Sequence, residues 1–192
     1  MPNLAEARLL KAANAIAYWL KHPNTKYVNL TNAFKLIHYL DFIHTKRTGR
    51  PFFSFTHLAQ DYGPVPEEIS REVYEKGKES VMWPIVSWSR AGTDSGRWNI
   101  VANKEPDMDV FTKAEIRTLE DVAFLMAELT AKQASESTHG VNGPWHHVYH
   151  GVGKGAQIDI SAAFDIEGFD GTERELDEAK ESFSLFRGFD AA

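Results

Sequence analysis

The hydrophobic positions of residues 30–48 recur at helical spacing and predict a helix around which we expect the rest of the chain to be organised. At about 100° per residue they share one broad arc, which consists of Leu30, Ala33, Leu36, Ile37, Leu40 and Ile43. The polar residues Asp41 and His44 fall inside that arc. Lys35, Thr45 and Lys46 fall outside it, so we expect them on a solvated face.

A similar pattern predicts an earlier helix from Leu4 to Lys21, which ends before Pro23. Asn29 or Thr31 is suited to cap the following helix, because each side chain accepts hydrogen bonds from free backbone N–H groups. Gly49 is predicted to end that helix in the left-handed conformation.

The pattern changes between residues 52 and 66. Residues 52–58 are short and aromatic, and we expect an extended or irregular segment that covers one end of the core. Tyr62-Gly63-Pro64-Val65-Pro66 then combines two prolines, which fix φ, with a permissive glycine. One interpretation is a rigid elbow between two helices, with Pro66 in the first turn of the second; the other is an exposed loop that contacts a partner.

Residues 81–89 and 97–102 are predicted to form a β-hairpin, because Trp98, Ile100 and Ala102 alternate with other residues and a polar, glycine-containing loop separates the two runs. Trp83, Trp88 and Trp98 make this hairpin aromatic. The tryptophans are suited to pack on the helices or to form an aromatic binding edge.

Helical patterns dominate the remainder of the chain. Thr112 and Glu115 form a capping box that opens one helix, and Thr130 is suited to cap a shorter helix that ends near Thr138. Beyond Phe164 we expect a mobile acidic linker and one amphipathic helix. The predicted fold is therefore mainly helical α+β: a single domain of about five or six helices with a small antiparallel β-hairpin, covering residues 1–164, followed by an acidic extension of residues 165–192.

Composition narrows the class of protein. The chain has no cysteine, which excludes disulfides and thiolate chemistry, and no run of about 20 apolar residues that would span a membrane. We expect a cytoplasmic protein. Residues 165–192 contain nine acidic and three basic residues, which account for the whole net charge of −6. A neutral body with an acidic tail disfavours direct binding of nucleic acid.

Two clusters of polar residues are candidates for chemistry. His146 and His150 stand four apart, with His139 and His147 nearby, which is compatible with a metal site, although no acidic third ligand is obvious. Asp41 and His44 stand three apart and are compatible with a catalytic dyad, but no glycine-flanked serine and no cysteine accompanies them. We favour a buried pair that is satisfied by backbone groups of residues 52–62 and fixes that segment on the helix.

Several short motifs occur in an order that resembles the SocA-like antitoxin family, also called the Panacea domain. They are Lys35-Leu36-Ile37-His38-Tyr39-Leu40-Asp41, Gly49-Arg50-Pro51, Tyr62-Gly63-Pro64-Val65-Pro66, Phe111-Thr112 with Glu115, Ser137-Thr138-His139 and Pro144-Trp145. The resemblance covers residues 30–164 and departs from the family in a shortened helical turn after residues 158–161. On this basis Asp41, His44, Gly49, Pro66, His139 and Trp145 are predicted to be structural motif residues.

The resemblance implies an antitoxin of bacterial or phage origin that binds and neutralises a co-encoded protein toxin stoichiometrically, without enzymatic activity and without a cofactor. We predict that the toxin contacts Tyr62, Gly63, Pro64 and Val65 at the elbow, and Trp83, Trp88 and Trp98 on the hairpin. One alternative is a proteolytic adaptor, in which the tail ending in Ala191 and Ala192 delivers the toxin to a bacterial protease. A second is a metal-dependent hydrolase that uses the region from His139 to His150.

Overall fold

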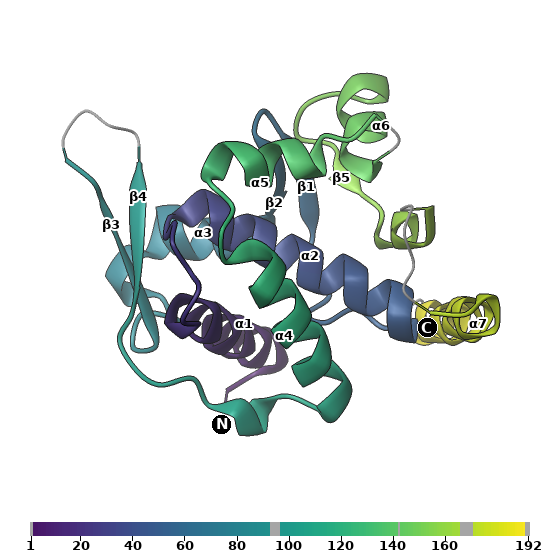
Figure 1. Cartoon of the computed structure of the whole chain (residues 1–192), viewed down its shortest axis with the longest axis horizontal. Coiled ribbons are helices and arrows are strands. Elements are labelled where there is room, and N and C mark those ends of the chain that lie inside the picture. The colour runs from purple at the N-terminus through teal and green to yellow at the C-terminus, as the bar shows by residue number, and fades with distance from the viewer. Residues whose placement is uncertain (1, 93–96, 142, 166–170, 191–192) are drawn as a thin grey trace.

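The computed structural model describes residues 2–92, 97–141, 143–165 and 171–190, and Figure 1 shows the arrangement of its elements. In chain order these are α1 (Leu4–Lys21), α2 (Leu30–Thr48), β1 (His57–Gln60), β2 (Gly63–Pro66), α3 (Glu67–Arg71), the π-helix η1 (Glu72–Lys76), the 3₁₀ helix η2 (Gly77–Glu79), β3 (Val86–Arg90), β4 (Trp98–Ala102), the 3₁₀ helix η3 (Met108–Val110), α4 (Lys113–Met126), α5 (Ala131–Thr138), α6 (Pro144–Gly151), β5 (Gln157–Ile158), the 3₁₀ helix η4 (Ile160–Asp165) and α7 (Glu173–Asp190). The mainly helical α+β class is confirmed, with seven α-helices and two small antiparallel sheets in this described part of the chain.

Helix α2 crosses the middle of the molecule, with the β3–β4 hairpin towards one end and α7 at the other (Figure 1). Its caps are as predicted: the Asn29 side chain accepts from the Asn32 N–H, and Gly49 adopts φ 72°. Elements α1, α4, α5, β2, η4 and α7 all contact it. The predicted solvated face is wrong, because Lys35, Thr45 and Lys46 are 1%, 0% and 7% exposed. A helix enclosed on every side has no such face.

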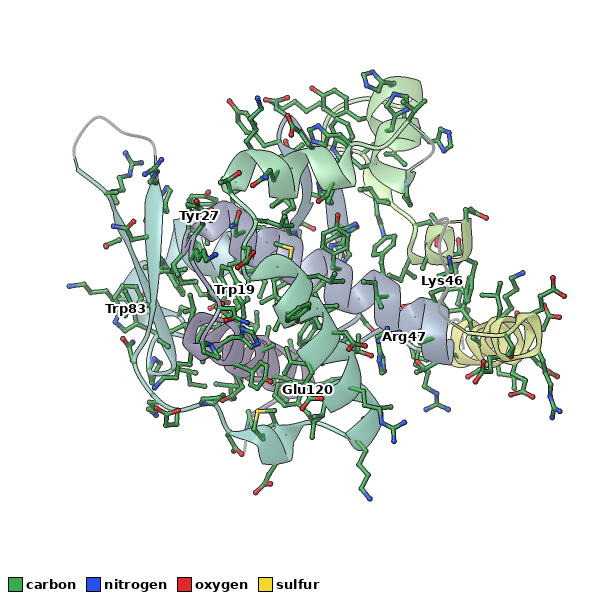
Figure 2. All side chains as sticks on the ribbon, in the orientation of Figure 1. Trp19, Tyr27, Lys46, Arg47, Trp83 and Glu120 are labelled. Carbon is green, nitrogen blue, oxygen red and sulfur yellow. The ribbon has the colours of Figure 1, made fainter. Side chains whose placement is uncertain are left out.

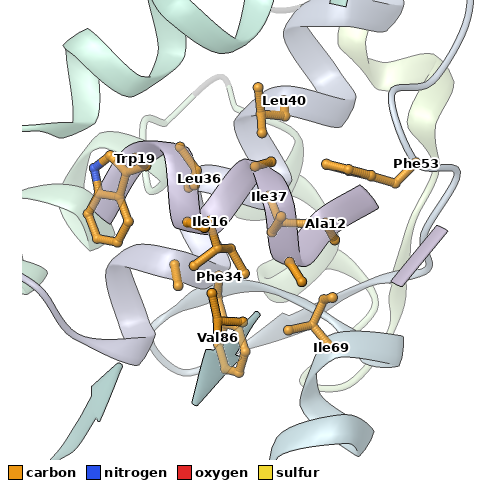
Figure 3. Close-up of a cluster of buried hydrophobic side chains, with 14 of the residues drawn as sticks. Ala12, Ile16, Trp19, Phe34, Leu36, Ile37, Leu40, Phe53, Ile69 and Val86 are labelled. Atoms are coloured by element: carbon orange, nitrogen blue, oxygen red, sulfur yellow. The ribbon is translucent and has the colours of Figure 1, made fainter. Parts of the chain in front are cut away.

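The main hydrophobic core lies between α1, α2, α4 and the hairpin. Figure 3 shows its centre, where Ile16 and Trp19 of α1 lie close to Leu36 of α2 and all three are fully buried. Burial of each large apolar side chain contributes about 1.5–3 kcal/mol, so this α1–α2 contact is a principal source of stability.

The motif predicted to be an elbow is instead an edge strand. Gly63–Pro66 pairs antiparallel with His57–Gln60, and β5 pairs with the other side of β1, which gives the sheet order β2-β1-β5. The chain reverses at Asp61 and Tyr62, and α3 begins directly after Pro66. The sequence did not predict this strand, because proline is rare in strands other than those at the edge of a sheet.

The predicted hairpin is confirmed, but its first strand is shorter than expected. Residues 82–86 form tight turns, in which Ile85 and Val86 donate to the Met82 carbonyl, and β3 begins at Val86. Trp88 pairs with Ile100 across the hairpin and both side chains are buried. Part of the predicted loop, residues 93–96, lies outside the described residues.

The C-terminal helices begin where the capping residues predict. Thr112 caps α4 and Thr130 caps α5 through complete capping boxes, and Thr172 exchanges hydrogen bonds with Glu175 at the start of α7. Helix α7 buries Ala179 and Phe183 against the end of α2. Most of the predicted linker, and Ala191 and Ala192, lie outside the described residues. In the described part of the chain, no helix has the length and apolar character needed to cross a bilayer.

Candidate functional site

The carboxylate of Asp41 fixes the segment that follows α2. It accepts hydrogen bonds from the N–H groups of Phe53 at 2.6 Å, Ser54 at 3.2 Å and Phe55 at 3.3 Å, and it lies 2.9 Å from Nε2 of His57. Asp41 is fully buried, so these partners replace water around the charge. The clamp also holds Ser54 at φ 60°, a conformation that is uncommon for residues other than glycine. Asp41 thus ties residues 53–57 to α2.

The predicted pairing of Asp41 with His44 is wrong. Nδ1 of His44 lies 3.0 Å from the Thr118 hydroxyl of α4, so His44 ties α2 to α4. Burial lowers the pKa of His44 to about 4, against the opposing effect of Glu115. His57, which residue spacing did not single out, takes the place beside Asp41. His38 packs against His57, and burial lowers its pKa well below the usual range. These imidazoles lie in the interior, where a dyad would have no access to substrate.

Lys35 joins α2 to the edge strand β2. Its amine donates to the Pro64 carbonyl at 2.9 Å, and no ion pair with a carboxylate is present in the described residues. Burial lowers the pKa of Lys35 to about 7. A Cβ at Gly63, where φ is 96°, would lie 2.5 Å from this amine and from the Thr138 hydroxyl, so only glycine allows the approach.

The free edge of β2 is closed to a further strand. The Glu67 N–H donates to the Thr56 carbonyl, and Leu58 pairs with Val65. In this antiparallel register the backbone groups of Pro64 and Pro66 are directed away from β1. Neither proline has an N–H group, and the Pro64 carbonyl is already occupied by Lys35. The Tyr-Gly-Pro-Val-Pro motif therefore prevents a further strand from pairing with this edge of the sheet.

The C-terminal motif residues form a stacked cluster beside the three-stranded sheet. The ring of His139 stacks on Trp145 at 3.8 Å, and the Trp145 indole donates to the Gln60 carbonyl at 2.9 Å. The ring of Tyr149 also stacks on Trp145, with the ring centroids 4.7 Å apart, and its hydroxyl donates to the Asp61 carboxylate. Trp145, with His139 stacked on it, thus attaches α6 to the end of β1.

The histidines of this region do not assemble as metal ligands. His146 and His150 lie on one side of α6 with ring centroids 4.5 Å apart. Across the ranges that the structure describes, no group of three or more histidine, aspartate or glutamate side chains could hold a metal ion. Nothing in the geometry favours the hydrolase alternative.

An exposed cleft of about 780 Å³ lies between the α1–α2 loop, α5 and strand β4. Five aromatic side chains from distant parts of the sequence line it: the buried Phe34, and the more accessible Tyr27, Tyr62, Tyr74 and Trp98. We call it the aromatic cleft. Tyr27, labelled in Figure 2, lies on the side of the molecule that carries the hairpin. Tyr62 is 76% exposed, and the Tyr74 and Trp98 rings meet edge to face at 5.5 Å. Exposed aromatics grouped in a concave surface are typical of protein interfaces.

The π-helix η1 positions Tyr74 in this cleft. The Trp88 indole donates to the Val73 carbonyl at 3.1 Å, and the buried carboxylate of Glu72 accepts from Lys76 and Ser80. Such single π-helical turns occur frequently at functional sites. Tyr74 also lines a neighbouring cleft of about 400 Å³, formed over β1 and β2 by Leu58 and Val65.

The seven predicted toxin contacts therefore lie in different environments, some in the clefts and some buried. Tyr62 and Trp98 line the aromatic cleft, and Val65 lines the neighbouring cleft over β1 and β2. Trp83, labelled in Figure 2, is half-buried and packs edge to face on Trp88 at 5.1 Å. The prediction that Gly63, Pro64 and Trp88 lie on the surface is wrong, since all three are buried.

Sequence reasoning missed Tyr27 and Tyr74. Neither belongs to a hydrophobic periodicity, because Tyr27 lies in a loop and Tyr74 in the π-helix. An aromatic residue flanked by charged residues was the available signal, as in Lys26-Tyr27 and Tyr74-Glu75-Lys76.

A comparison with protein families identifies most of this framework. The family described as antitoxin SocA-like, Panacea domain, matches residues 34–146, more than half of the chain. The match begins in α2 and ends in α6, so it includes the Asp41 clamp, the Lys35–Pro64 contact and Trp145. The chain belongs to this family. Comparison with curated proteins and with solved structures gave no significant match.

Proposed function

We propose that this member of the SocA-like family is an antitoxin that neutralises a co-encoded protein toxin by stoichiometric binding in the cytoplasm, without catalysis and without a cofactor. Membership of an antitoxin family is the observation that carries the proposal. The aromatic cleft supports it, because exposed tyrosine and tryptophan side chains are the residue types that anchor protein interfaces.

The mechanism needs a surface that occupies the toxin and a framework that keeps this surface rigid. The three tyrosines of the cleft supply apolar area at low cost in conformational entropy, since each has only two rotatable side-chain bonds. The framework is provided by the Trp88–Val73 and Asn32 hydrogen bonds, which fix η1 and the α1–α2 loop on either side. A rigid surface loses less entropy on binding and so binds more tightly.

The test is growth of cells after induction of the neighbouring reading frame, with and without this chain. We expect the neighbour to arrest growth and this chain to restore it. The double variant Tyr62→Ser/Tyr74→Ser should lose rescue while it retains the wild-type unfolding transition. Leu185→Ser is the control, because Leu185 is 63% exposed on α7, which lies at the end of α2 opposite the hairpin (Figure 1). A harmless neighbour, or a failure of the wild-type chain to rescue, would refute the antitoxin function.

The structure changes how the adaptor alternative should be tested. Helix α7 packs on Gly49, so a deletion of residues 165–192 would disturb the fold as well as remove the tail. Substitution of Ala191 and Ala192 by aspartate leaves α7 in place. If delivery to a protease contributes, these substitutions should prolong the toxin's lifetime in cells while complex formation with the purified proteins is unchanged.

A further inference from the structure

The turn that carries Tyr62 is held in place by helices α5 and α6, which we call the α5–α6 pair. The Ser135 hydroxyl of α5 donates to the Tyr62 carbonyl at 3.1 Å. The Trp145 indole of α6 donates to the Gln60 carbonyl, just before the turn, at 2.9 Å. The position of Tyr62 in the aromatic cleft therefore depends on the attachment of this pair to the sheet.

The α5–α6 pair buries little apolar surface. The buried residues of α5 are Ala134, Ser135 and Thr138, and two of these three are polar. In α6, as far as the structure describes it, Trp145 is the one buried side chain. A segment with few buried apolar contacts opens locally at a lower cost in free energy than the core does. The pair can therefore separate from the sheet while the α1–α2 core stays folded.

The end of α5 covers the buried amine of Lys35. The Lys35 amine and the Thr138 hydroxyl both lie 2.5 Å from the position that a Cβ would take at Gly63. Burial lowers the pKa of Lys35 to about 7. Burial, and then the charge of Lys35, also lower the pKa of His139, whose Nε2 atom is buried and makes no hydrogen bond within the described residues. Both groups therefore bind protons weakly while the pair is attached.

Little negative charge balances these two groups. The titratable side chains around them come from α2, β1, α5 and α6: His38, His57, Glu136, His146 and His150. Glu136 raises the pKa of His139, but its side chain is 61% exposed and lies 3.7 Å from the Lys132 amine. Among the described residues Lys35 makes no ion pair, and Asp41 and Asp61 are bound to His57 and Lys154. A proton taken up in the attached state is therefore poorly stabilised.

From this arrangement we propose that the α5–α6 pair is a pH-sensitive switch, in which proton uptake by Lys35 and His139 detaches the pair from the sheet and releases the turn that carries Tyr62. Detachment breaks the hydrogen bonds of Ser135 and Trp145 to this turn and admits water to the Lys35 amine. A toxin bound in the aromatic cleft would then be held less tightly at acidic pH. This consequence rests on the proposed function, whereas the switch itself does not.

The direction of the switch follows from proton binding. In the detached state water surrounds both groups, so the pKa of Lys35 returns towards 10.5 and that of His139 towards 6.5. The detached state then binds protons more strongly than the attached state, and lowering the pH favours detachment. Lys35 contributes as the pH falls from about 10.5 to about 6, where its titration in the attached state is complete, and His139 contributes below 6.5.

The experiment measures amide hydrogen exchange of the full chain at pH 8 and pH 6, expressed as protection factors. We expect α5 and α6 to be less protected than α1, and their protection to fall about tenfold from pH 8 to pH 6. In Lys35→Met, which keeps the length of the side chain but cannot titrate, this fall should shrink to less than threefold. Lys180→Met on α7, at an exposed position, is the matched control and should keep the tenfold fall.

A second variant and a titration test His139. His139→Phe retains a ring that can stack on Trp145 but takes up no proton, so it should remove the fall in protection between pH 6.5 and pH 5 and leave the fall from pH 8 to pH 7 unchanged. In an NMR titration of the histidines, Lys35→Met should raise the pKa of His139 by about half a unit, because a neighbouring positive charge is lost.

The outcomes separate the switch from the proposed function. Protection in α5 and α6 that equals that of α1 would overturn the switch, because the pair would then open only with the whole fold. A fall in protection that is the same in wild type and Lys35→Met would overturn it as well. If the exchange results are as expected and the product of the neighbouring reading frame does not bind, the switch stands and the antitoxin function fails. If that product binds, its dissociation rate should rise severalfold from pH 8 to pH 6 in wild type but not in Lys35→Met.

Discussion

The amine of Lys35 lies 2.9 Å from the carbonyl oxygen of Pro64, and this contact joins the central helix to the edge of the sheet. Both residues belong to motifs of the family, 29 positions apart in the chain. The contact explains three residue choices together: a long cationic side chain on a buried helix, a glycine at position 63 that leaves room for it, and a proline that offers an acceptor without a competing donor.

Lys35 should give the stability of the protein a characteristic dependence on pH. Its pKa is about 7 in the folded chain and 10.5 when exposed, so the unfolded state binds the proton more strongly between these values. The free energy of unfolding therefore rises with pH in this window. From pH 7 to pH 9 the wild type should gain about 2 kcal/mol relative to Lys35→Met. Urea unfolding at both pH values measures this, with Lys180→Met as the exposed control. Parallel curves for wild type and Lys35→Met would contradict it.

His44 should act in the same direction as Lys35, but in a window at acidic pH. Its pKa falls from 6.5 to about 4 on folding, so the unfolded state takes up the proton first as the pH is lowered. The free energy of unfolding should therefore decrease as the pH is lowered from 6.5 to 4. His44→Asn keeps a hydrogen-bond partner for Thr118 but cannot titrate, so this decrease should be smaller by about 2 kcal/mol in the variant. Chemical unfolding at pH 7 and pH 5 compares the slopes. His22→Asn, at a partly exposed position, is the control; an unchanged slope in His44→Asn would count against the buried neutral imidazole.

Asp41→Asn tests the clamp on residues 53–57. The substitution removes the charge and directs an N–H₂ group towards backbone N–H donors, so we expect a loss of about 3 kcal/mol. The measurement is the urea midpoint. Asp177→Asn, on the exposed side of α7, should change stability by less than about 0.5 kcal/mol. Equal effects of the two substitutions would show that the clamp contributes little.

Gly49→Ala tests how α7 is held. Position 49 requires φ 72°, and an added Cβ would lie 2.7 Å from Cβ of Ser182 and 2.8 Å from the Phe183 nitrogen. We expect a loss of about 2 kcal/mol and faster hydrogen exchange throughout α7. Gly188→Ala in α7 itself meets no atom within 4 Å and should stabilise the helix by about 0.5–1 kcal/mol. Unchanged exchange in α7 of Gly49→Ala would contradict the close packing.

The sequence predicted elements whose signals are local. The caps at Thr112 and Thr130 depend on residues three positions away and were predicted correctly, and Asn29 is the one of the two candidates, Asn29 and Thr31, that caps α2. The burial of Lys35 could not be predicted, because the helical wheel describes one helix and the acceptor that makes burial tolerable lies on another element. The same limit applied to the Asp41–His57 contact.

The candidate site was predicted only in part for a related reason. Tyr62 and Trp98 were identified from their motifs, but the cleft exists because the α1–α2 loop, η1 and β4 converge in space. The spacing of residues along the chain cannot predict that these three elements lie close together. Trp88 was identified for its residue type, and its burial follows from the hairpin register, which places it opposite Ile100 on the core side.

The packing of α7 on Gly49 has a consequence for synthesis of the chain. Helix α2 emerges from the ribosome early, yet one of its ends is covered by α7, which is translated more than 100 residues later. The nascent chain can assemble α1, α2 and the sheet, but the end of α2 stays uncovered until α7 has emerged. A chain truncated before Glu173 would therefore expose apolar surface at Gly49, which quality-control proteases could recognise.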